Sequence, residues 1–117
     1  MMPRQALFLT TLCLLTISAT GKTEEAARLF DEGNSHYRNG DFEAARTFYE
    51  NARKSGFESA ALYHNLGNAY FRLDKLGMAM VSYQRAARLQ PGDEAIEHNI
   101  RIVQTRSRDR FSQVPKP

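Results

Sequence analysis

The chain contains a single cysteine among its 117 residues, and that cysteine lies in an apolar run near the N-terminus. Lipid attachment at Cys13 would require a small residue directly before it, and Leu12 is not one. If the N-terminal run is removed, the remaining chain has no cysteine at all. No disulfide can then stabilise the fold, so its stability must come from helix packing.

Signatures of catalysis and of nucleic-acid binding are also missing. No serine is flanked by glycines, no cysteine is placed as a nucleophile, and no pair of acids is arranged for acid–base chemistry. We therefore expect no enzyme, no catalytic residue and no cofactor. The formal net charge of +3 comes from scattered arginines and not from a dense basic block with a recognisable motif. This distribution argues against nucleic acid as a partner.

The longest apolar run, residues 6–17, is too short to cross a bilayer, which needs roughly 20 residues. It follows Arg4 and precedes the small residues Ala19 and Gly21, the three-part layout of a secretory signal. We expect residues 1–21 to be a signal peptide and the protein to be exported to a bacterial periplasm or cell envelope. An uncleaved signal that anchors the chain in the membrane is the alternative.

After the signal, apolar residues recur with the helical period. Five helices are expected, over about residues 24–39, 42–55, 60–73, 75–89 and 94–106. Thr23, Asp41, Ser59 and Asp93 are predicted N-caps. The last expected helix has a single apolar stripe, so its other side should face water. Residues 107–117 lack periodicity and end in prolines, which predicts a disordered tail or the start of a linker.

The helical region repeats itself at a constant spacing, which is the number of residues from Ala26 to Ala60. We call this spacing one repeat length. Ala26, Ala27, Gly33, Asn34, Arg38, Ala45, Tyr49 and Ala52 then fall on Ala60, Ala61, Gly67, Asn68, Arg72, Ala79, Tyr83 and Ala86. Small residues at Gly67 and Ala79 should let two helices approach closely, and Gly77 is expected to mark a further helix contact. The expected organisation is a first repeat at 24–58, a second repeat at 59–92 and a capping helix at 93–106.

The second repeat carries a specific spacing of aromatic, small and apolar residues. The residues are Tyr63, Leu66, Gly67, Tyr70, Ala79, Tyr83, Ala86 and Pro91. This pattern resembles the tetratricopeptide repeat (TPR). The resemblance implies an all-α, right-handed solenoid of helix-turn-helix units, with two repeats and a C-terminal capping helix. It also implies a non-catalytic module that binds a protein or peptide in a concave groove.

A narrower resemblance joins the signal, residues 62–71 and residues 97–103. Together they are similar to the envelope TPR proteins of aerotolerance (Bat-type, BatE-like) operons, which commonly continue into a membrane helix and an SH3-like domain. This chain has neither, so the resemblance implies a truncated or repeat-only relative. It further implies envelope proteins as partners and a supporting role in tolerance of oxidative stress.

In the TPR family, the first helix of each pair lines the groove. The residues expected there are Phe30, Asn34, Tyr37, Arg38, His64, Asn65, Asn68, Phe71, Arg72, His98 and Arg106. Asparagine suits this role because its amide both donates to and accepts from a peptide backbone. The arginines of this set recur at one repeat length and could pair with a carboxylate, although the dipole at a helix C-terminus explains the same residue type. The carboxylate clamp of chaperone-binding TPR proteins is incomplete, because Phe30, Ala95 and Asn99 replace its basic residues.

Two alternatives to peptide binding remain open at this point. Exposed ends of a short solenoid can pair head to tail, which would make the module a self-assembling spacer. A metal-dependent enzyme is the less favoured alternative: His64 and His98 are separated by one repeat length, but a metal site would need a third ligand. We therefore predict no metal.

Overall fold

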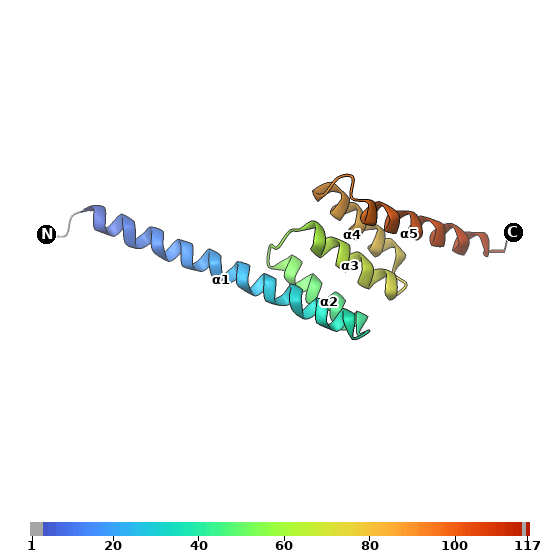
Figure 1. Cartoon of the computed structure of the whole chain (residues 1–117), viewed down its shortest axis with the longest axis horizontal. Coiled ribbons are helices and arrows are strands. Elements are labelled where there is room, and N and C mark those ends of the chain that lie inside the picture. Colours follow the sequence, from blue (N-terminus) through green and yellow to red (C-terminus); the bar gives the residue numbers. More distant parts are fainter. Residues whose placement is uncertain (1–3, 116) are drawn as a thin grey trace.

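The computed structural model describes residues 4–115 and 117, with side chains from residue 21 onward except that of residue 116. The described residues form five α-helices and no strand. The helices are α1 (Arg4–Arg38), α2 (Phe42–Lys54), α3 (Ala60–Arg72), α4 (Leu76–Leu89) and α5 (Glu94–Ser112). Each helix packs against the next one along the chain, and α1 also contacts α3. This succession of antiparallel helices is an all-α solenoid, so the predicted fold class is confirmed (Figure 1).

Three of the four predicted helix caps are confirmed. The side chains of Asp41, Ser59 and Asp93 each accept a hydrogen bond from the backbone N–H three residues on, at 3.3, 3.0 and 3.1 Å. Such caps contribute about 1 kcal/mol each. The turns between helices also follow the repeat. Asp74 adopts a φ of 61°, the left-handed conformation that Gly40 adopts one repeat length earlier with a φ of 80°.

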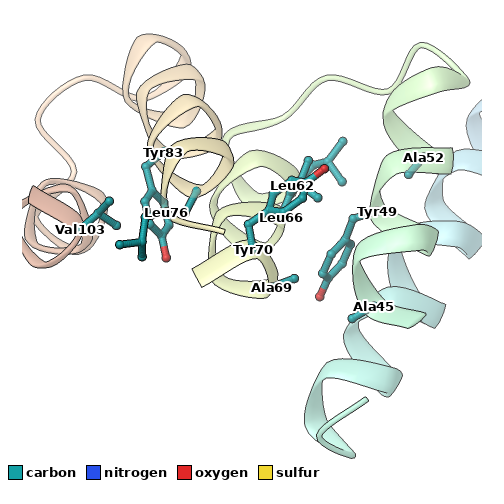
Figure 2. Close-up of a cluster of buried hydrophobic side chains, with 11 residues drawn as sticks. Ala45, Tyr49, Ala52, Leu62, Leu66, Ala69, Tyr70, Leu76, Tyr83 and Val103 are labelled. Atoms are coloured by element: carbon teal, nitrogen blue, oxygen red, sulfur yellow. The ribbon is translucent and has the colours of Figure 1, made fainter. Parts of the chain in front are cut away.

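The core depends on tyrosine rings packed against glycines of the neighbouring helix. A Cβ added to Gly67 would lie 2.6 Å from the ring of Tyr83, and one added to Gly33 would lie 2.5 Å from the ring of Tyr49. The predicted close approach at Gly67 is therefore confirmed. Figure 2 shows the Tyr49 ring projecting from α2 into the space beside α3. The expected crowding at Gly77 is wrong, because nothing lies within 4 Å of a Cβ there.

Two helix boundaries differ from the prediction. The first helix begins at Arg4 and passes through Thr23, so Thr23 is not an N-cap. Residues 5–20 contain no proline or glycine, and Gly21 does not adopt a positive φ, so nothing ends the helix there. Figure 1 shows this part of α1 extending away from the other helices.

The last helix is also longer than expected and includes residues 107–112 of the predicted tail. No proline or glycine interrupts it before Pro115. In addition, Arg110 forms an ion pair with Asp74, which ties the final turns of α5 to the turn between α3 and α4.

A signal peptide is predicted for residues 1–21, and the structure describes no side chain before residue 21. The signal peptide therefore stays a prediction. Within the described part of the chain, no helix is both long enough and apolar enough to span a membrane.

Helix α5 closes the solenoid because only one of its faces is apolar. Ile96 and Val103 are buried, whereas Glu97 and Arg101 are exposed. One repeat length before Glu97 and Arg101 stand Tyr63 and Gly67, which are buried. Helix α5 thus corresponds to the first helix of a third unit in which polar residues replace that buried face.

Candidate partner-binding groove

An asparagine–tyrosine hydrogen-bond unit joins the first three helices. The Tyr49 hydroxyl of α2 donates to Oδ1 of Asn34 on α1 at 2.6 Å. The Asn65 amide of α3 donates to the same oxygen at 2.9 Å. Both lone pairs of that oxygen are then used, which holds the Asn34 side chain in one orientation. We call Asn34, Tyr49 and Asn65 the first asparagine–tyrosine unit.

The same arrangement recurs one repeat length further along the chain. The Tyr83 hydroxyl donates to Oδ1 of Asn68 at 2.6 Å, and the Asn99 amide donates to that oxygen at 3.2 Å. Nδ2 of Asn99 also lies 2.8 Å from Nε2 of His64. Asn68, Tyr83 and Asn99 form the second asparagine–tyrosine unit. The two units together link α1 through α5.

The first unit lines a cavity of about 260 Å³. Its lining residues are Asn34, Tyr37, Arg38, Tyr49, Asn65 and Asn68. Five of these are among the predicted groove residues, so the structure brings that part of the set together. The sixth, Tyr49, was expected only as a repeat position; its hydroxyl fixes Asn34.

Burial raises the pKa of Tyr49 to about 12 and also raises the pKa of Tyr83. Both hydroxyls are protonated donors at neutral pH, as a free tyrosine is, and burial extends this state to more alkaline pH. Burial lowers the pKa of His64, against a smaller opposing effect of the Asp93 carboxylate. His64 is then neutral at pH 7, and its Nε2 can accept the hydrogen bond from Asn99.

The three arginines predicted to form a row have different surroundings. Arg38 lines the cavity. The guanidinium of Arg72 lies 4.2 Å from the centroid of the Phe42 ring, and that of Arg106 lies 4.8 Å from the centroid of Phe71. Stacking on a ring leaves the edges of a guanidinium available to an anion. Only Arg38, however, adjoins the cavity itself.

Phe30 contributes to the core and does not line the cavity. Its ring packs against Tyr49 and Phe57, with centroid distances of 5.9 and 6.0 Å. His64 stands one repeat length later and packs against Tyr83 at 5.9 Å in the same way. The expectation that both side chains face the groove is corrected for Phe30, because an aromatic ring at this position fills the gap beside the buried tyrosine.

His98 and Arg106 lie apart from the cavity, in a hollow of about 440 Å³ along α5. The other residues lining this hollow are Arg101, Ile102, Thr105 and Asp109. Phe71 is not in either lining and lies under Arg106. Five of the predicted residues therefore line the cavity and two line this hollow, whereas Phe30, His64, Phe71 and Arg72 line neither. In the described part of the chain, no three His, Cys, Asp or Glu side chains are grouped to hold a metal ion.

Asn99 is a member of the second unit that the prediction did not include among the groove residues. It stands one repeat length after Asn65, as Tyr83 stands one repeat length after Tyr49. Each asparagine that accepts from a tyrosine also precedes that tyrosine by 15 residues. These two spacings in the sequence would have identified both units.

Comparison with known families identifies a match over α3 and α4. The tetratricopeptide repeat model matches residues 60–93, which cover α3, α4 and the turn after them. The chain therefore contains a TPR repeat at these residues. No curated protein sequence matches the chain. TPR repeats generally mediate protein–protein interaction and are typically non-catalytic.

Proposed function

We propose that this protein is a non-catalytic module that binds an extended polypeptide segment in the groove lined by α1 and α3. The observation that supports this proposal is the asparagine–tyrosine hydrogen bonding, which leaves a defined set of amide groups for a partner. The proposal carries no catalytic step.

The asparagine side chains of the cavity keep hydrogen-bonding groups that complement the N–H and C=O groups of a peptide backbone. In Asn34 and Asn68, Oδ1 accepts two hydrogen bonds, and Nδ2 has no partner among the described residues. In Asn65 the amide nitrogen is used and Oδ1 is left to accept. The groove thus offers two amide NH2 groups as donors and one carbonyl oxygen as acceptor, which suit the C=O and N–H groups of an extended chain. Because the amides are already oriented, less entropy is lost on binding.

The charge beside these amides indicates which segments are preferred. Arg38 borders the cavity, and the two asparagine–tyrosine units are neutral. A single guanidinium at the edge favours a segment with a carboxylate near the bound stretch. Selectivity for acidic side chains should therefore be moderate, and the backbone contacts should supply most of the affinity.

Selection of binders from a random peptide library, followed by calorimetry, tests this proposal. Selected peptides should lose about tenfold or more in affinity for the double variant Asn34→Ala, Asn68→Ala, because two hydrogen bonds of about 1 kcal/mol each are removed. Asn39→Ala is the control, since Asn39 is exposed just after α1 and does not line the cavity. Peptides that bind the double variant and the parent equally would rule out this groove.

We further propose that the module is exported and acts with other proteins of a bacterial envelope complex linked to aerotolerance. The layout of residues 1–21 and the resemblance to Bat-type envelope proteins support this proposal. Mass spectrometry of the protein from the cell envelope should find Lys22 as the first residue. Recovery of the uncleaved chain from the cytoplasm would contradict export.

A further inference from the structure

A second groove lies between α2 and α4 and shares no lining residue with the cavity described above. Its volume is about 460 Å³, and the buried residues Leu66 and Tyr70 of α3 lie between the two helices. It continues into a hollow of about 490 Å³, because Arg53 and Arg85 line both. We call the two together the α2–α4 groove.

Positive charge is concentrated along this groove. Its lining includes five cations and two carboxylates, namely Arg46, Arg53, Lys54, Arg85, Arg88, Glu50 and Glu58. Their formal net charge is +3, and +2 when Glu43, which is ion-paired with Arg46 outside the lining, is counted with them. Arginines that look scattered in the sequence are thus gathered here, because α2 and α4 both pack on α3.

Several of these cations have no counter-ion. The Glu50 carboxylate forms an ion pair with Arg53 at 2.8 Å and accepts a hydrogen bond from the Tyr70 hydroxyl at 2.9 Å. It is therefore not available to the other cations. Among the described residues, neither Lys54 nor Arg88 forms an ion pair. Arg85 likewise has no carboxylate partner there and lies 5.7 Å from the centroid of the Tyr63 ring.

Apolar side chains lie exposed in the same groove. Met78 and Val81 of α4 are 46% and 41% exposed and line its wall. Leu89, 48% exposed, lines the adjoining hollow. Such residues provide contact area for an apolar surface, while the surrounding cations select its charge.

We propose that the α2–α4 groove docks an acidic amphipathic helix of a partner protein. A helix with carboxylates along one edge and apolar residues along another complements both features of the groove. A polyphosphate ligand suits the groove less well. The apolar side chains of Met78 and Val81 cannot form hydrogen bonds with phosphate, and the carboxylates of Glu50 and Glu58 repel it. This surface is separate from the peptide groove, so each can fail its test without the other.

The test measures binding of a synthetic peptide to the full-length chain by fluorescence anisotropy. The probe is an amphipathic peptide of about 16 residues, with glutamates on one helical face and leucines on the other. Charge reversal by Arg85→Glu with Arg88→Glu should weaken binding about tenfold or more. Binding should also weaken as salt rises from roughly 50 to 300 mM. Met78→Gln should weaken it at every salt concentration, because that loss is apolar.

Arg101→Glu with Arg108→Glu is the matched control, since it reverses two exposed arginines on α5 outside the groove. Circular dichroism should show that all variants keep the parent helix content. The proposal is overturned if the probe does not bind, if the control weakens it as much as the double variant, or if a glutamine version of the probe binds equally well. Tighter binding of duplex DNA or of phosphatidylglycerol vesicles, lost in the double variant, would identify a phosphate site and also overturn it.

Discussion

The Tyr83 ring lies so close to the Gly67 backbone that a Cβ there would come within 2.6 Å of two ring carbons. The atoms met are in the body of the ring and not at a flexible end. Gly67→Ala must therefore displace the ring, and with it the hydroxyl that donates to Asn68. We expect a loss of about 1–3 kcal/mol in the free energy of unfolding, measured by urea titration with circular dichroism.

Gly77→Ala is the matched control for this prediction. Gly77 is also helical, but a Cβ there would have no neighbour within 4 Å. Since alanine is the better helix former, the variant should be unchanged or up to about 1 kcal/mol more stable. A loss for Gly77→Ala as large as that for Gly67→Ala would show that the Gly67 effect does not come from the tyrosine contact, because better helix propensity can only stabilise both variants.

Alkaline pH should destabilise the fold through the buried tyrosines. In the folded chain the pKa of Tyr49 is about 12, whereas a free tyrosine has a pKa of about 10. The stabilisation from its protonated hydroxyl is complete below about pH 10 and is lost as the pH rises toward 12. We expect the midpoint of urea unfolding to fall steeply over this interval. Tyr49→Phe should make the fall shallower, although the variant loses the hydrogen bond to Asn34 at all pH values; an unchanged slope would contradict the prediction.

The elements that recur at one repeat length could be predicted from the sequence. The caps at Asp41 and Ser59, the turn at Asp74 and the glycine–tyrosine contact all depend on local chemistry or on the repeat. A cap needs only a side-chain oxygen three residues before a helical N–H, so its prediction does not require knowledge of the tertiary structure.

The α2–α4 groove could not be predicted in the same way, because most of its cations do not follow the repeat; only Lys54 and Arg88 are one repeat length apart. Arg53 corresponds to Ala87 on the next repeat, and Arg46 corresponds to Met80. Only the packing of both helices on α3 brings the cations together. The stacking of Arg106 on Phe71 likewise depends on how α5 lies against α3.

The outer face of α1 should prevent further repeats from stacking on this end. Arg28 and Glu32 are exposed on α1, whereas Leu62 and Leu66, one repeat length later, are buried. Replacing the first pair by leucine would give α1 the apolar stripe of an internal helix, which in solenoids must be covered. We expect Arg28→Leu with Glu32→Leu to self-associate in sedimentation velocity at concentrations where the parent chain and the polar control, both positions to Gln, sediment alike. If the parent already associates and the Gln variant abolishes this, the polar face is itself an assembly surface, and the spacer function is favoured over a separate binding module.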